Sequence, residues 1–364
     1  MPSLLPSSRQ RPFHMLLFLG GGVWVIAARG LAVRAANGLT IRFNLSLFND
    51  LIQQAFLLFL LLWGFATLSW MATRPSTREE DGRGYGLRAG NALPNRATTR
   101  EEWMRGAAIG WGMVLAALLP MVLTGSLHPQ FDFSWENLGL AVVSLLTLAL
   151  LTLTVEIVFR GFLFMEMIAA TNSGFATFFL SFLYAALGSL RPDDTLFSVL
   201  NTFLFGILLC TCYLRTRALW IGWGVHFGWN AVLAVLFGIP LSGDVSYSNL
   251  VFTSAAGPQW LTGGAYGPEA GMLTGAVLLV SIVVVLRVTR QYAWEYTYRP
   301  PAPGGYPMDT SAPAGHNPSP APLVQILASS PSSPFVNPTS PGSSPGSSPG
   351  SPPGSPPGAP PSQP

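Results

Sequence analysis

The sequence predicts an all-α fold: a polytopic membrane helix bundle of about eight transmembrane helices with a disordered C-terminal tail. Of its 364 residues, 49% are hydrophobic and only 10% are charged, against roughly a quarter charged in an ordinary soluble domain. Long apolar stretches follow one another with few charges inside them, and the end of the chain is dominated by Pro, Ser and Gly. Together these observations indicate a single membrane domain with appendages.

Candidate spans are stretches that approach the length of a transmembrane helix, about 20 mostly apolar residues. They cover about residues 15–33, 52–72, 107–125, 138–158, 175–190, 196–214, 218–238 and 270–288. The first is short and contains Arg29. It resembles a signal peptide, but no A-x-A cleavage site follows it. We therefore expect an uncleaved membrane anchor.

Three regions follow from this pattern. Residues 1–104 hold the N-terminal helices and an Arg-rich loop, residues 105–290 the helical core, and residues 291–364 an interfacial aromatic segment and the tail. A Pro/Ser/Gly-rich tail cannot bury enough apolar surface to offset its ordering entropy, so we expect it to be disordered. A proline-recognition role is the alternative to an inert tail.

Arginine positions predict the orientation, because Arg-rich loops stay in the cytoplasm. Residues 73–106 contain seven arginines, whereas residues 239–269 contain no Lys or Arg. Placing the first loop inside puts both termini in the cytoplasm, although Arg34, Arg42 and Arg191 do not fit. We expect an integral membrane protein that contacts lipid. Nucleic acid is not an expected partner despite a pI near 9.1, since most arginines fall where cytoplasmic loops would place them.

Four polar residues interrupt the apolar spans. Glu156 and Arg160 lie at the fourth span, and His226 and Asn230 lie in the seventh. A charge near the bilayer centre costs roughly 2.5–3.5 kcal/mol on insertion scales, so each needs a reason. Each pair is spaced i, i+4 and shares one helix face. A structural ion pair and a core histidine would explain each pair alone; together they predict a polar cavity between helices.

The depth of this site follows from a turn expected at residues 171–174. Glu156 and Gly188 each lie about 16 residues from that turn, so they share a layer roughly 24 Å away at about 1.5 Å per residue. By the same rise, His226 lies only about 13 Å beyond Arg217. The depths agree if the turn projects into the cytoplasm, in which case the site faces the cytoplasm.

Three segments resemble the CAAX protease and bacteriocin-processing family of intramembrane endopeptidases. VEIVFRGFLF at 155–164 resembles the EExxFRGFL signature, LYAALGSL at 183–190 occupies the place of the FxxxH segment, and LWIGWGVHFGWN at 219–230 is similar to the HxxxN segment. GPQWLTGGAYGPEAG at 257–271 resembles a segment of a bacterial branch, so we expect a bacterial inner (plasma) membrane. The resemblance covers about residues 105–290.

The resemblance implies cleavage of a prenylated or otherwise hydrophobic peptide near its C-terminus. In the family, the first Glu and the His of FxxxH activate a water, and the His and Asn of HxxxN hold the oxyanion. Here Val155 replaces that Glu and Gly188 replaces that His. The family's functional residues that carry over are Glu156, Arg160, His226 and Asn230.

Positioned acid–base groups contribute typically 10²–10⁴-fold, so losing both should be severe. Our first hypothesis is a protein that binds hydrophobic or prenylated peptides or membrane proteins in a cytoplasm-facing cavity and cleaves them weakly or not at all. The second is an active endopeptidase with Glu156 as base; Glu156 lies about 100° around the helix from Val155 and would need a kink or rotation. A third, a small-solute transporter, rests on topology alone and predicts inverted repeats that the sequence does not display.

No cofactor and no tightly bound metal are expected. One His, one Glu and one Asn fall short of the three or four ligands usual for zinc. Cys210 and Cys212, two positions apart on a helix, are interpreted as reduced core residues rather than a disulfide. We assign no catalytic role to Glu166 or Glu269.

Overall fold

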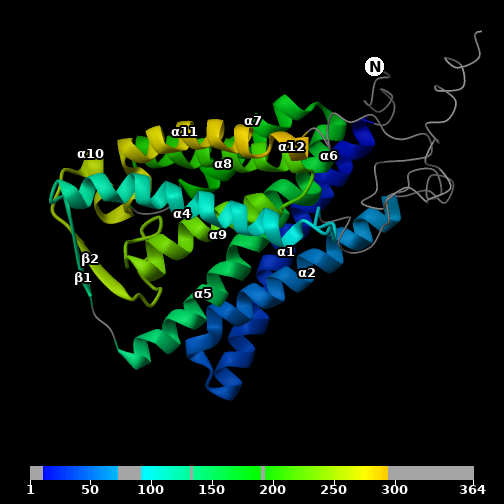
Figure 1. The fold of residues 1–364 in the computed structure, drawn as a ribbon. Helices are drawn as coiled ribbons and strands as arrows, with labels where there is room; N and C mark the ends of the chain where they lie inside the picture. The colour runs from blue at the N-terminus through cyan, green and yellow to red at the C-terminus, as the bar shows by residue number, and fades with distance from the viewer. Residues whose placement is uncertain (1–10, 73–91, 132–133, 190–192, 294–364) are drawn as a thin grey trace, which may run out of the picture. The chain divides into compact units, whose positions relative to one another are not determined.

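The described part of the chain is a bundle of helices (Figure 1). The structure is a computed structural model that describes residues 11–72, 92–131, 134–189 and 193–293. Its longer helices are α1 (Arg11–Phe43), α2 (Asn49–Ala72), α4 (Thr99–Leu123), α5 (Trp135–Glu156), α6 (Leu163–Ala170), α7 (Ser173–Gly188), α8 (Leu196–Thr216), α9 (Trp220–Asn230) and α11 (Met272–Val288). Short helices complete it: η1 (Ser46–Phe48), η3 (Ile157–Phe162), η4 (Ala231–Leu236), α10 (Gln259–Thr262), η5 (Gly264–Tyr266), η6 (Pro268–Ala270) and α12 (Arg290–Ala293).

The predicted all-α membrane bundle is confirmed, and each predicted span corresponds to an apolar helix. Within the described ranges, five helices are long and apolar enough to cross a membrane, and three apolar helices are shorter. Two predicted boundaries are wrong. The first helix runs for 33 residues, Arg11–Phe43, and the fourth continues to Ala170, because charged residues inside or beyond an apolar stretch do not by themselves end a helix. The turn expected at 171–174 is present but shorter, at Thr171 and Asn172: α6 ends at Ala170, and the Asn172 side chain caps α7, which begins at Ser173.

A two-stranded antiparallel sheet, which no pattern in the sequence predicts, joins the segments before α5 and after η4. β1 (Leu127–Phe131) pairs with β2 (Val251–Ala255), with Leu127 opposite Ala255. β2 belongs to the 239–269 segment that the arginine distribution places outside. The paired strands, which come from distant parts of the chain, lie at one end of the bundle (Figure 1).

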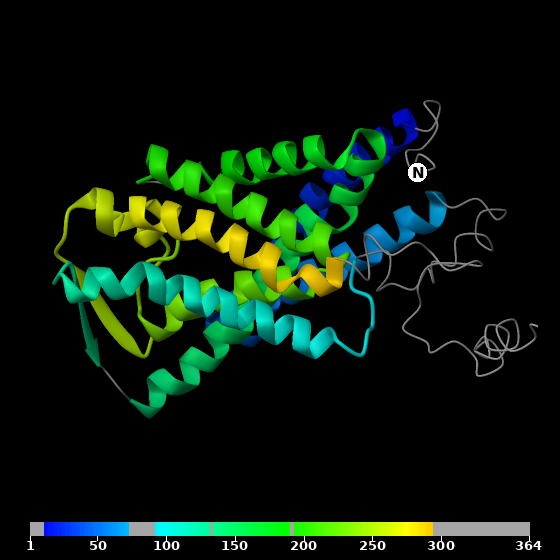
Figure 2. The ribbon, with the colours of Figure 1, turned by 45° about the horizontal axis from the view of Figure 1, so that its top comes forward.

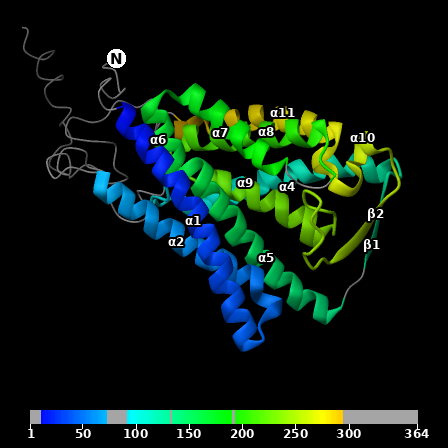
Figure 3. The same ribbon diagram turned by 180° about the vertical axis from the view of Figure 1, so that it is seen from behind.

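Helix α9 lies at the centre of the packing, where it contacts α4, α5 and α8. Figures 1 and 2 show α11 running alongside α8, and Figure 3 shows α1 beside α2 and α6. Buried apolar residues form two clusters, one including Leu118, Leu208 and Ile221 and the other including Leu61 and Phe162. Because lipid tails are as apolar as leucine, close van der Waals packing must supply much of the helix–helix attraction.

Reciprocal glycines allow the backbones of α4 and α9 to touch. A Cβ atom built on Gly106 would lie 2.2 Å from the carbonyl oxygen of Ile221, and one on Gly110 would lie 2.4 Å from that of Val225. Conversely, a Cβ on Gly224 would lie 2.3 Å from the carbonyl oxygen of Trp103. This small-xxx-small packing fixes α9, which carries His226 between Gly224 and Gly228, against α4.

Several predictions fall outside the described residues. They concern the tail from residue 294 onward, the part of the Arg-rich loop between residues 73 and 91, and Arg191. The cytoplasmic placement of the termini stays a prediction.

Candidate functional site

The fourth span carries its motif on an irregular stretch of helix. Glu156 is the last residue of α5, and Arg160 lies in the π-helical segment η3. Within η3, Gly161 departs from helical geometry, with φ −88° and ψ −120°. π-Helical insertions are rare and are frequent at functional sites. A second π-helical segment, η4, begins directly after Asn230, so both retained motifs adjoin an irregular turn.

The structure brings Glu156, Arg160 and His226 together. Nδ1 of His226 lies 2.8 Å from Oε1 of Glu156, close enough to donate a hydrogen bond to the carboxylate. Nη1 of Arg160 lies 3.5 Å from the same oxygen. The Glu156 and Arg160 residues are each 1% exposed and His226 is 4% exposed. This is an enclosed, charge-balanced cluster, the form in which buried ionisable groups persist.

The neighbouring helices leave room for this cluster and cover it with aromatic rings. A Cβ atom on Gly222 would lie 3.4 Å from Oε2 of Glu156, so a larger residue at this position would crowd the carboxylate. The ring of Phe205 meets the imidazole of His226 edge-on at 5.3 Å. The guanidinium of Arg160 lies 4.7 Å from the ring centroid of Tyr184, within the range of a cation–π contact.

Asn230 is also buried and lies one turn after His226 on α9. This is the expected i, i+4 placement on one helix face. Two of the sequence-predicted residues, Glu156 and His226, are therefore in direct contact across helices, Arg160 joins them, and Asn230 follows on the same helix.

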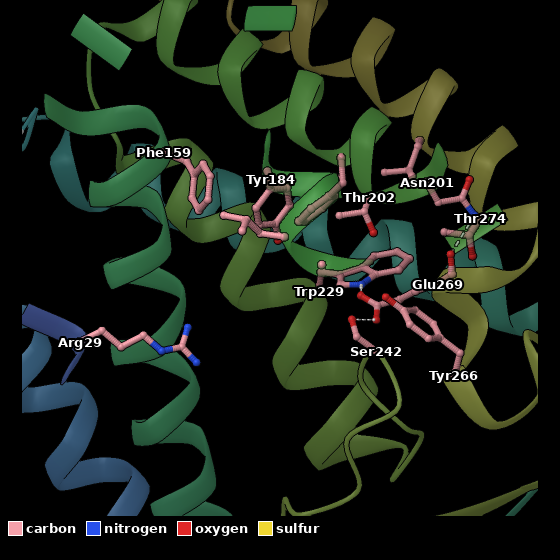
Figure 4. Close-up of a pocket in the computed structure, with 14 residues that line it drawn as sticks. Arg29, Phe159, Tyr184, Asn201, Thr202, Trp229, Ser242, Tyr266, Glu269 and Thr274 are labelled. Carbon is pink, nitrogen blue, oxygen red and sulfur yellow. Dashed lines mark hydrogen bonds between the residues drawn. The ribbon is translucent and has the colours of Figure 1, made fainter. Parts of the chain in front are cut away.

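A cavity of about 230 Å³ lies next to the cluster (Figure 4). Tyr184, Gly188, Phe205 and Trp229 line it, together with Glu269. The motif residues Glu156, Arg160, His226 and Asn230 are not among its lining residues. Phe205 and Tyr184, which touch His226 and Arg160, line the cavity. The expected polar cluster and this hollow are thus neighbours, separated by aromatic side chains.

The two substituted positions differ in their surroundings. Gly188, at the end of α7, lines the cavity, and a Cβ built on it would meet only the Cγ2 of Thr202 at 3.7 Å. Val155 is partly exposed on α5 and is not a lining residue of this cavity. The cavity therefore adjoins the position where the family has its second-segment histidine.

Sequence reasoning missed the polar wall of the cavity. Trp229 Nε1 donates to Oε1 of Glu269 at 3.0 Å, and Ser242 Oγ donates to Oε2 at 2.6 Å. Asn201 donates to the backbone of the same segment. The available signal was the glycine-rich stretch 257–271, whose glycines predict tight backbone turns around Glu269.

The residues at the cluster do not fit a metal ion. The guanidinium of Arg160 places a positive charge 3.5 Å from the carboxylate oxygen that a cation would need. Across the described ranges, no group of three or more His, Cys, Asp or Glu side chains is arranged to hold a metal. Cys210 and Cys212 are free thiols, both fully buried.

The fold and cluster define a class: a polytopic membrane protein with a Glu–Arg–His cluster enclosed between helices. The sequence model of the type II CAAX prenyl endopeptidase Rce1-like family matches residues 137–232, which include all four motif residues. The matched region, about a quarter of the chain, is thus similar to this CAAX protease family. No curated protein and no solved structure is significantly similar to it.

Proposed function

We propose that this CAAX-protease-like protein binds hydrophobic or prenylated peptides within the membrane and cleaves them weakly or not at all. The observation that carries the proposal is that the carboxylate of Glu156 is already occupied by neighbouring side chains. Oε1 of Glu156 is engaged by both His226 and Arg160, while the family's water-activating positions are Val155 and Gly188.

A general base must reach a water molecule that also touches the scissile carbonyl. Glu156 is 1% exposed and does not line the neighbouring cavity. An oxyanion site formed by His226 and Asn230 would contribute about 10²–10³-fold per donor, but it stabilises nothing until a nucleophile attacks. Peptide binding without turnover suits a chaperone, a sequestering factor or an immunity-type protein.

An active endopeptidase is the second candidate, and one observation favours it. The 2.8 Å contact between the Glu156 carboxylate and the His226 imidazole has the geometry of an acid–base pair. The irregular helix η3 directly after Glu156 supplies a place where the helix could rotate. Such a rotation would have to break the Arg160 ion pair before the carboxylate could meet a substrate.

A cleavage assay separates the two candidates. Purified protein in lipid nanodiscs is given prenylated and unprenylated membrane peptides, with peptide binding followed by fluorescence anisotropy and cleavage by mass spectrometry. We expect saturable binding and no turnover above background. Turnover that His226→Ala abolishes would overturn the first candidate. Glu166→Gln, which alters a carboxylate bonded to His14 rather than to the cluster, is the matched control.

A further inference from the structure

Glu269 is a carboxylate held in place from several sides. Trp229 and Ser242 each donate a hydrogen bond to one of its two oxygens. The Nδ2 of Asn201 donates to the carbonyl oxygens of both Glu269 and Gly271, each at 2.8 Å. Thr274 Oγ1 donates to the carbonyl oxygen of Pro268 at 2.6 Å. Both the side chain and the backbone of Glu269 are therefore fixed before any ligand arrives.

The surrounding glycines tighten this arrangement. Gly267 has a φ of +99°, and a Cβ on it would lie 2.2 Å from the carbonyl oxygen of Pro240. A Cβ on Gly271 would lie 2.4 Å from the carbonyl oxygen of Leu261. Only glycine fits at Gly267, because its backbone conformation strains other residues and another backbone lies against it. The segment that carries Glu269 is thus tightly packed against neighbouring backbone.

The charge of Glu269 has no cationic partner within the described ranges. Trp229 and Ser242, which donate to it, are neutral, and no arginine or histidine of the described ranges forms an ion pair with it. Arg29 of α1 also lines the cavity, but Figure 4 shows it apart from the group around Glu269. Burying part of a carboxylate without a counter-charge costs free energy. Because Glu269 lines a cavity, there is space beside it for a positively charged group.

The walls of the cavity suit an organic cation. Trp229 and Tyr266 lie beside Glu269 (Figure 4). Phe205 and Tyr184 are also lining residues and add to the aromatic wall. Aromatic faces attract alkylammonium groups through their quadrupoles, most strongly where water is excluded. The volume of about 230 Å³ is below the range typical of drug-sized ligands, about 300–1,000 Å³, and matches a small group or one side chain.

We propose that this cavity is a binding site for an alkylammonium group, whose charge pairs with Glu269 while its carbon atoms contact Trp229 and Tyr266. The group belongs either to a free organic amine or to a lysine side chain of a membrane peptide. The site does not depend on peptide cleavage or on the Glu156 cluster. Failure of the function proposed above would leave it intact.

The test uses the full-length protein in lipid nanodiscs and isothermal titration calorimetry with n-butylammonium. Glu269→Gln keeps an oxygen that can accept from Trp229 but removes the charge, so affinity should fall about tenfold to a hundredfold, as for loss of a charge-assisted hydrogen bond. Glu166→Gln should bind like the parent protein. Equal affinity of Glu269→Gln and the parent, or no heat of binding with the parent, would refute the proposal.

A second arm does not depend on the variant folding. The parent protein is titrated with n-butanol, which has the same carbon chain without the charge, and tighter binding of the ammonium by at least about tenfold is expected. Equal binding of alcohol and ammonium would count against the carboxylate. Displacement of n-butylammonium by a lysine-containing membrane peptide, and not by its norleucine counterpart, would assign the ammonium to a peptide side chain; displacement by neither would assign it to a free amine.

Discussion

The imidazole Nδ1 of His226 lies 2.8 Å from Oε1 of Glu156, although the two residues belong to α9 and α5. The same carboxylate oxygen lies 3.5 Å from Nη1 of Arg160. All three side chains are enclosed by protein. Each group is therefore stable in its place only while its partners are present, which gives the cluster a measurable structural role whether or not it is catalytic.

Glu156→Gln should destabilise the protein by about 3–5 kcal/mol, because it leaves the buried Arg160 without a counter-charge. Reversible unfolding in mixed micelles by sodium dodecyl sulfate measures the change. The control, Glu166→Gln, removes a carboxylate whose partner His14 is 25% exposed at its side chain, so about 1 kcal/mol or less is expected. Equal losses in the two variants would contradict the structural role of the cluster.

Gly224→Ala should destabilise the α4–α9 contact, because its new methyl group would lie 2.3 Å from the carbonyl oxygen of Trp103. Overpacking of this kind costs typically about 1–3 kcal/mol. Gly112→Ala is the matched control on α4, since a Cβ there has no heavy atom within 4 Å. The same unfolding titration applies to both. A Gly224→Ala protein as stable as the parent would show that the two helices lie further apart.

The sequence was sufficient to predict the bundle and the meeting of Glu156 with His226. Apolar length fixes the spans, and polar residues that cannot face lipid must find one another. The sequence could not predict the β1–β2 pairing or the hydrogen bonds that hold Glu269. Strands β1 and β2 lie far apart along the chain, as do Glu269 and its partners Asn201 and Ser242, and no local pattern links them. The π-helical turn after Glu156 likewise has no periodic signature.

Asn201→Leu should loosen the segment around Glu269. The variant loses the two hydrogen bonds to the carbonyl oxygens of Glu269 and Gly271, each worth about 1 kcal/mol. Hydrogen exchange followed by mass spectrometry should show faster exchange in residues 263–271 and unchanged exchange in α4. Unchanged exchange in residues 263–271 would mean that the glycine packing alone holds the segment.

The predicted orientation in the membrane can be tested by labelling introduced cysteines. The native Cys210 and Cys212 are fully buried and should not react with the label. Ser246→Cys and Arg100→Cys each place a thiol on an exposed position. If the arginine distribution sets the topology, a membrane-impermeant maleimide should label Ser246→Cys in intact cells and Arg100→Cys only after permeabilisation. The opposite pattern would invert the orientation, and with it the cytoplasmic placement of the termini.

Restoring the family's two water-activating groups tests what the substitutions removed. The double variant is Val155→Glu with Gly188→His. A Cβ at position 188 would meet only the Cγ2 of Thr202, at 3.7 Å, so the backbone there leaves space for a side chain to begin. Positioned acid–base groups are worth about 10²–10⁴-fold, and cleavage of a membrane peptide should rise from background into a measurable range.

The rise should vanish when His226→Ala is added, because the oxyanion would lose a donor. The single variants should show little gain, since each supplies one of two groups that act together. The double variant could fold and bind peptide and still show no cleavage. In that case the loss of the two side chains would not be what prevents cleavage. The aromatic side chains between the cavity and the Glu156 cluster would instead keep the peptide away from the cluster. Adding Phe205→Ala to the double variant would then be expected to let the peptide reach the cluster, because Phe205 contacts His226 and lines the cavity.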